Sequence, residues 1–321
     1  MSHEITIRVN KKAEMAYVGE TPWHGLGSEL QFGADIETWK VAAGMDWNVN
    51  RSRVRYGEGA EQRIFDDQHV LFRSDTKAPL GVVGKNYKIV QPGECLEFFR
   101  DLVSGAGFTL ETAGTLFGGK RYWALARISE DAVVVGQDRV GGFLLLSSSC
   151  DGSLATSGRF TTVRVVCNNT LTMAHSAKAS AKVSHRSNFS AGEMKDTLGI
   201  ARDEFASFMS GARALAKVKM NDLTLSEFLK KLMIEQKVTS KVDQVTTLPA
   251  FEKMMNLWKG NAMGGTLAGA SGTAWGEVNA VTEYVDHHAK ADHQANRLFN
   301  AWWGRGETLK NAALTSALAM V

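Results

Sequence analysis

The sequence predicts an α+β protein, with a mostly antiparallel β-sheet and flanking helices in the N-terminal half and a helical C-terminal half. Between residues 47 and 167, stretches that alternate apolar and polar residues are separated by glycine turns. After Ser190, apolar residues recur at helical spacing instead. We therefore expect an N-terminal arm over residues 1–33, an α+β core over residues 34–189 and a helical region over residues 190–321.

The strands are predicted from period-2 alternation and from turn dipeptides. Gly118-Gly119 and Asp151-Gly152 lie between β-rich flanks, so each is expected to turn a hairpin. The other predicted strands are Trp47–Tyr56, Arg63–Arg73, Gly81–Val90 with a bend at Gly84, and Thr161–Cys167.

The helices are predicted from apolar stripes and capping residues. A short helix is expected over Ala34–Ala43, and another begins near Pro92 and includes Cys95–Val103. Asn168 or Asn169 is expected to cap a helix that runs to about Ala181. The C-terminal helices are predicted at Glu193–Lys219, Ser226–Gln236, Pro249–Gly260, Val278–Lys290, Gln294–Trp303 and Glu307–Met320.

The composition is typical of a soluble globular protein, with 44% hydrophobic and 22% charged residues. No stretch approaches the roughly 20 apolar residues that span a bilayer, and the N-terminus lacks a signal-peptide core. We expect a cytoplasmic protein with no membrane contact. The three cysteines, Cys95, Cys150 and Cys167, are widely spaced, which argues against both a disulfide framework and a zinc site.

Positive charge is concentrated locally, although the net charge is only +3. Arg51, Arg53 and Arg55 have the same parity, so in a strand they share a face and repeat about every 7 Å. Such a ladder suits a phosphate backbone, because guanidinium groups match phosphate oxygens. The alternative is an edge strand whose charge prevents aggregation.

A second basic group spans residues 159–186, where there is no Asp or Glu. Its cations are Arg159, Arg164, Lys178, Lys182 and Arg186. This pattern favours a polyanionic partner, or else a solvated basic face. Tyr122, beside Lys120 and Arg121, is the best candidate for base stacking, although aromatic residues in strands more often belong to the core.

No catalytic motif is present, and we expect neither enzymatic activity nor a cofactor. The run Asp286–His293 contains three His and two Asp, with His288 and Asp292 one helical turn apart. A polar helix surface explains this run more simply than a metal site does, and no metal ligand is assigned.

Five blocks of the sequence, in order, resemble the phage/plasmid-like protein family, a domain-of-unknown-function family of mobile elements. They are Ala13–Gly27, Gly81–Glu94, Phe108–Ile128, Asp151–Leu171 and Thr273–His288. The resemblance implies a phage or plasmid origin and action inside the cell, and it carries no catalytic residues. At the level of fold, β-hairpins followed by a basic strand and a helix are similar to phage single-strand annealing proteins, which form rings or filaments on DNA.

The sequence therefore predicts a single-stranded-DNA-binding protein, a single-strand annealing or recombination factor that acts as a homo-oligomer, in a ring or a filament. The predicted nucleic-acid-binding residues are Arg51, Arg53, Arg55, Lys120, Arg121, Tyr122, Arg164, Lys178, Lys182 and Arg186. The alternative is a non-enzymatic accessory protein that binds a host protein, as a replication modulator or defence antagonist, through C-terminal helices that include Trp258, Trp302 and Trp303. A metal-dependent enzyme that uses His287, His288 and His293 is a third hypothesis.

Overall fold

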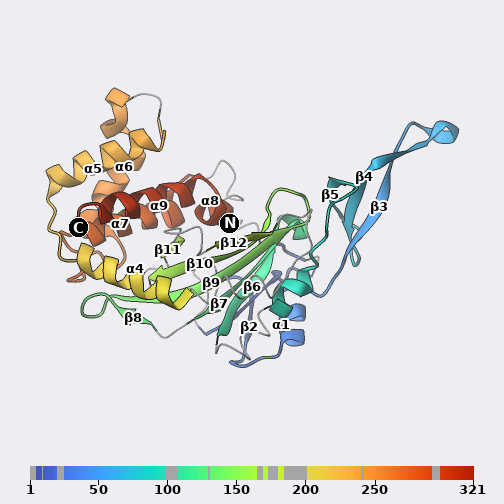
Figure 1. The fold of residues 1–321 in the computed structure, drawn as a ribbon, viewed down its shortest axis with the longest axis horizontal. Coiled ribbons are helices and arrows are strands. Elements are labelled where there is room, and N and C mark those ends of the chain that lie inside the picture. The colour runs from blue at the N-terminus through green and yellow to red at the C-terminus, as the bar shows by residue number, and fades with distance from the viewer. Residues whose placement is uncertain are drawn as a thin grey trace.

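The described residues fold into two β-sheets and a helical layer (Figure 1). The computed structural model describes residues 5–8, 10–19, 25–98, 108–128, 131–164, 169–172, 180–183, 201–239, 242–290 and 297–321. The predicted α+β class, with antiparallel-rich sheets first and helices after them, is confirmed.

The larger sheet holds nine strands in the described part of the chain, in the order β11-β10-β9-β7-β6-β1-β2, with β12 beside β10 and β8 beside β9. All of its pairs are antiparallel except β1–β2. Its strands are β1 (Met15–Val18), β2 (Ser28–Leu30), β6 (Thr109–Leu116), β7 (Arg121–Arg127), β8 (Ala132–Val133), β9 (Arg139–Ser149), β10 (Thr156–Arg164), β11 (Asn169–Thr172) and β12 (Ser180–Val183).

Both predicted hairpin turns are present in this sheet. A short 3₁₀ turn, η2 (Phe117–Gly119), joins β6 to β7, and Gly118 and Gly119 have φ of 72° and 93°. Gly152, between β9 and β10, has φ of 77°. Glycine adopts these positive φ angles without the steric cost that a Cβ imposes, which is why the dipeptides predict the turns.

The smaller sheet is the projecting sheet, formed by β3 (Val49–Tyr56), β4 (Arg63–Arg73) and β5 (Pro79–Gly84) in the order β3-β4-β5. The sequence predicts β4 with the observed bounds. The far ends of β3 and β4 extend well away from the rest of the molecule (Figure 1). Helix α1 (Ile36–Ala42) lies near the base of this sheet and is capped by Asp35.

The helical half contains α4 (Ala201–Leu215), α5 (Asp222–Glu235), α6 (Pro249–Asn256), α7 (Ala274–Glu283), α8 (Arg297–Trp303) and α9 (Arg305–Leu318). Single π-helical turns, Leu257–Asn261 and Tyr284–His288, extend α6 and α7. Every residue of α7 is buried. These helices lie at the opposite end of the molecule from the tip of the projecting sheet (Figure 1).

One hydrophobic core joins the large sheet to the helices. Aromatic rings meet edge to face across this boundary. The ring centres of Phe160 (β10) and Phe205 (α4) are 6.1 Å apart, and those of Trp123 (β7) and Trp302 (α8) are 5.2 Å apart. Such edge-to-face contacts stabilise the fold by more than the burial of their apolar surface alone. No helix in the described residues combines the length and apolar composition needed to cross a membrane.

The N-terminal segment contributes to the large sheet. The predicted arm over residues 1–33 provides β1 and β2, and β1 lies between β6 and β2. Met15 and Ala16 are buried in the core. This segment therefore helps to hold the fold together.

The predicted helix from Asn168 or Asn169 to Ala181 is wrong in the described part of that range. Asn169–Thr172 and Ser180–Val183 are strands β11 and β12, and both pair with β10. β11 lies opposite Thr161–Arg164 and β12 opposite Thr156–Arg159, so they follow one another along one edge of β10. Pairing with this edge satisfies the backbone groups of β10, and that tertiary gain outweighs the local capping signal.

Candidate nucleic-acid interface

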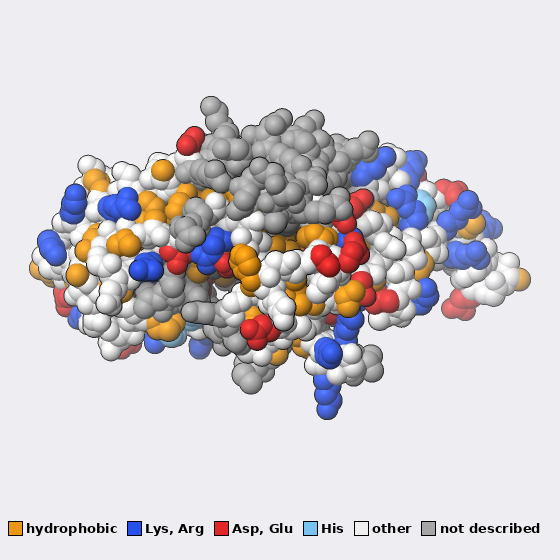
Figure 2. Space-filling view, turned by 90° about the horizontal axis from the view of Figure 1, so that it is seen from below, with side chains coloured by type: hydrophobic (Ala, Val, Ile, Leu, Met, Phe, Trp, Pro, Cys, Tyr) orange, Lys and Arg blue, Asp and Glu red, His pale blue; other side chains and the backbone are white. Residues whose placement is uncertain are grey.

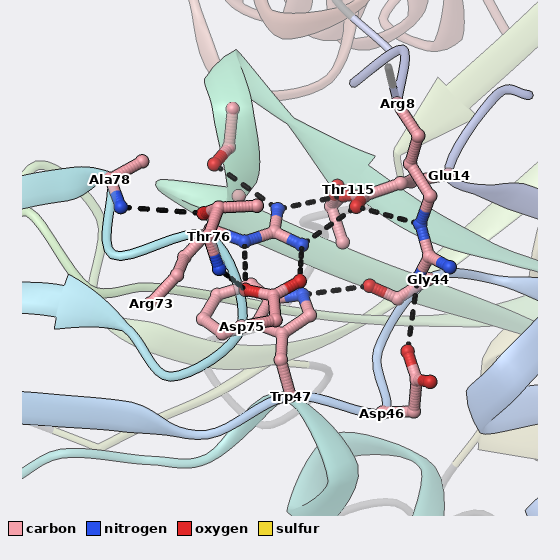
Figure 3. Close-up of polar contacts among 12 residues, drawn as sticks. Arg8, Glu14, Gly44, Asp46, Trp47, Arg73, Asp75, Thr76, Ala78 and Thr115 are labelled. Carbon is pink, nitrogen blue, oxygen red and sulfur yellow. Dashed lines mark hydrogen bonds and ion pairs between the residues drawn. The ribbon is translucent and has the colours of Figure 1, made fainter. Parts of the chain in front are cut away.

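A buried charge network attaches the projecting sheet to the large sheet (Figure 3). Arg73, at the end of β4, donates from Nη2 to Glu14 Oε1 at 2.7 Å and to Asp75 Oδ2 at 2.8 Å. Its guanidinium carbon lies 4.2 Å from the centre of the Trp47 ring. Glu14 also accepts hydrogen bonds from Arg8 and from Thr115 of β6. Glu14 therefore connects β4 to β6.

The charges in this network stabilise one another. The hydrogen bond from Arg73 is the main cause that lowers the pKa of Asp75 to about 2. Burial alone would lower the pKa of Arg73, but its bonds to Asp75 and Glu14 raise that pKa instead. Arg73 and Asp75 are therefore both charged at neutral pH, and their ion pair stabilises the base of the projecting sheet.

A second contact fixes β5 against the turn between β9 and β10. A Cβ at Gly81 would lie 2.9 Å from Asp151 Cα, so only glycine allows this approach. The Tyr87 hydroxyl donates to the Ser149 carbonyl at 2.8 Å. The projecting sheet is thus attached to the large sheet through both β4 and β5.

Arg51, Arg53 and Arg55 are exposed along β3. Arg55 Nη1 lies 3.3 Å from Gln62 Oε1. Within the described residues none of the three forms an ion pair with a carboxylate. Figure 2 shows Lys and Arg side chains gathered at the end of the molecule that carries this sheet, with acidic side chains among them. The predicted ladder is therefore a set of cations available to an external anion.

A groove of about 840 Å³ lies at the base of this ladder. It is lined by Arg51, Asp67, Gly84, Lys85, Asn86, Tyr87 and Lys88. Lys85 pairs with Asp67 at 2.8 Å, which raises the pKa of Lys85 and lowers the pKa of Asp67. Arg51 thus belongs both to the ladder and to a groove that contains two further lysines and one aromatic ring.

Lys120 and Arg121 lie beside the same junction. The Lys120 carbonyl accepts from the backbone N–H of Cys150 at 2.8 Å, next to the turn that contacts Gly81. The guanidinium of Arg121 lies between Phe299, 3.9 Å from the ring centre, and Phe117, at 4.6 Å. Burial lowers the pKa of Arg121. Arg121 is half-buried and supported by aromatic rings, so it presents less of its charge than the β3 arginines do.

Two predicted site residues lie in the interior. Tyr122 is 1% exposed and its hydroxyl donates to the Val90 carbonyl, so its ring is not available for base stacking. Arg164 is buried and donates to both carboxylate oxygens of Asp138, at 2.7 and 2.8 Å. Asp138 also accepts from Trp275 of α7. Arg164 therefore joins β10 to the helical half, and we leave both residues out of the candidate interface.

The remaining predicted cations are only partly described. Lys182 lies in β12, opposite Ser157 of β10. Lys178 and Arg186 lie outside the described residues. The predictions for Lys178, Lys182 and Arg186 therefore stay predictions.

The tryptophans of the alternative hypothesis are packed within the protein. Trp258 and Trp302 are each 9% exposed, and Trp303 donates to Ser147 Oγ at 3.1 Å. For the metal hypothesis, His288 lies 3.6 Å from Glu283, and His293 is outside the described residues. Within the part of the chain that is described, no group of His, Cys, Asp and Glu has the arrangement of a metal site.

Sequence reasoning did not select the groove residues Lys85, Tyr87 and Lys88. Their signal is the short run KNYK after the bend at Gly84, in which two lysines flank an aromatic residue. Only the folded structure brings this run beside Arg51.

The chain belongs to the DUF932 family, described as a domain of unknown function, whose model matches residues 79–303. The match includes the groove residues after Gly84, the large sheet from β6 onward and most of the helical half. It begins after β3 and β4, so the arginine ladder lies outside it. No curated protein and no solved structure shows significant similarity to the chain.

Proposed function

We propose that this protein binds single-stranded DNA as a phage- or plasmid-encoded annealing or recombination factor, acting inside the cell as a homo-oligomer. The observation that carries the proposal is the projecting sheet with Arg51, Arg53 and Arg55 exposed and without carboxylate partners among the described residues. Alternate residues of a strand are about 7 Å apart, close to the spacing of successive phosphates in an extended single strand.

The groove next to the ladder supports the same proposal. Arg51, Lys85 and Lys88 line it together with Tyr87. Proteins that hold a single strand without sequence preference combine a cationic track for the phosphates with aromatic rings for the bases. Affinity from such contacts should fall steeply with salt, because each bound phosphate releases counterions.

The decisive experiment compares the wild type with the triple variant R51Q/R53Q/R55Q by fluorescence anisotropy, using a labelled single-stranded oligonucleotide and a matched duplex over a salt series. The matched control is K217Q/K219Q/K231Q, which removes three exposed lysines from the helical half. We expect the arginine variant to bind the single strand at least about tenfold more weakly. The slope of the logarithm of affinity against the logarithm of salt concentration should be less steep by about 2, as expected for three lost phosphate contacts.

The control variant should retain the wild-type affinity and slope. Equal losses in both variants would indicate an effect of net charge and would contradict a site on β3. Absence of wild-type binding to either nucleic acid would contradict the proposal as a whole.

A further inference from the structure

The projecting sheet has two chemically different faces. Residues directly opposite each other in an antiparallel pair share a face. Val54 lies opposite Phe65, and Tyr56 lies opposite Arg63. Since β3 alternates, Val54 and Tyr56 lie on the face opposite to Arg51, Arg53 and Arg55. One face therefore carries the arginine ladder, with Ile64 opposite Arg55 and Leu71 opposite Arg51, and the other carries Val54, Tyr56 and Phe65.

An irregularity in β4 creates this division. Arg53 pairs with His69, whereas the next residue, Val54, pairs with Phe65. Asp66, Asp67 and Gln68 thus lie between the two pairs without a partner on β3. An odd number of extra residues reverses the side on which the following residues lie. As a result Phe65 lies on the same face as Val54 and Tyr56.

This apolar face is open to solvent. Tyr56 is 54% exposed, Phe65 43% and Val82 53%. Val82 belongs to the same face, because it pairs with Val70, which in turn pairs with Ser52. An exposed apolar patch of this kind is typical of a binding surface.

The charges around the face indicate what covers it. Arg63 shares the face with Tyr56, while Arg53 and Arg55 lie on the same strand just behind it. The patch has Arg63 on its own face and Arg53 and Arg55 on the other face of the edge strand β3, and none of the three has a carboxylate partner among the described residues. This arrangement complements a ligand that has both flat apolar surfaces and regularly spaced negative charges. Unpaired nucleotides have this combination, whereas a duplex hides the faces of its bases in the helical stack.

We propose that Tyr56 and Phe65 form a base-stacking platform, which makes unpaired bases the ligand of this face while the arginine ladder holds the phosphates. This inference rests on the proposed function, and it explains why a single strand would be preferred to a duplex. Stacking on one aromatic ring is sequence-tolerant, so little base preference is expected.

The test uses the full-length double variant Y56A/F65A with two labelled strands of equal length, oligo-dT and an abasic strand that retains the phosphates. We expect the variant to bind oligo-dT at least about fivefold more weakly than the wild type. Its affinity for the abasic strand and its salt slope should be unchanged, because no phosphate contact is lost. The variant Y56W, which keeps an aromatic ring at this position, should bind oligo-dT as tightly as the wild type does.

The matched control is F32A, which removes another exposed ring, 79% exposed and outside the projecting sheet. It should bind both strands as the wild type does. Equal weakening of Y56A/F65A on both strands would overturn the platform, because the rings would then act through the phosphates or the fold. If Y56A/F65A bound oligo-dT as tightly as the wild type does, the stacking platform would also be overturned. The proposed function would still be supported in that case if R51Q/R53Q/R55Q lost binding.

Discussion

At the scale of single residues, Glu14 has the most consequential set of contacts in the described structure. Its side chain is fully buried and accepts from two arginines and one threonine. One of these arginines, Arg73, belongs to the projecting sheet, and Thr115 belongs to the large sheet. A buried charge of this kind is tolerated only when its partners are complete. The contacts of Glu14 therefore couple global stability to the position of the projecting sheet.

The variant E14Q should destabilise the protein, because it leaves the buried guanidinium of Arg73 with less opposing charge. We expect the free energy of unfolding to fall by about 3 kcal/mol, as for the loss of one partner of a buried pair. Urea denaturation at pH 7 measures this. The control E58Q alters an exposed carboxylate and should change stability by less than about 0.5 kcal/mol. A change below about 1 kcal/mol in E14Q would show that the network contributes little.

At the scale of elements, β4 shows both the strength and the limit of sequence reasoning. Its weak period-2 alternation predicts a strand with the observed bounds, Arg63–Arg73. The faces of its residues do not follow from parity, because Asp66, Asp67 and Gln68 interrupt the pairing with β3. Nothing in an isolated strand specifies that interruption, since it arises from the register of two strands.

Shortening the projecting sheet should separate its function from the stability of the fold. Ser52 and Val70 are cross-strand partners, so an Asn-Gly turn can join them and remove residues 53–69. Most of the removed side chains are exposed, so the melting temperature should change by only a few degrees. Single-strand affinity should fall by more than about tenfold, because Arg53, Arg55 and the two aromatic rings are removed while Arg51 and the groove lysines remain. Calorimetry and anisotropy measure the two effects, and wild-type affinity in the shortened protein would locate binding elsewhere.

At the scale of the whole molecule, the helical half contains several polar side chains buried within the core that joins it to the sheet. Helix α7 is entirely buried, yet it includes Glu277, Asn279 and Glu283. Asp286 just after it pairs with the buried Lys310 of α9 at 2.7 Å. Neither carboxylate oxygen of Glu277 has a hydrogen-bond partner among the described residues, and burial raises its pKa from near 4.5 to about 9. This glutamate is therefore neutral in the folded protein at pH 7.

Glu277 should make global stability depend on pH. Its pKa is higher in the folded state than in the unfolded state, so between about pH 4.5 and pH 9 the folded state binds more protons. The free energy of unfolding should fall as pH rises through this range. The variant E277Q should flatten the slope and be more stable than the wild type by up to about 3 kcal/mol at pH 7.

Urea denaturation from pH 5 to pH 9 tests this prediction. The control E252Q, on the exposed side of α6, should keep the wild-type slope. If the free energies of unfolding of E277Q and the wild type changed with pH in parallel, Glu277 would ionise normally in the folded protein.

The sequence by itself determined the fold class, the strands on either side of each glycine turn and the helices of the C-terminal half, because these depend on local periodicity and on glycine's tolerance of positive φ. It also identified Arg51, Arg53 and Arg55 as a ladder on one strand. Only the tertiary structure decided that Arg164 and Tyr122 are buried, that Asn169–Thr172 is a strand, and that Lys85 and Tyr87 lie beside Arg51. These outcomes depend on contacts between residues far apart in the chain, whose energies no local pattern contains.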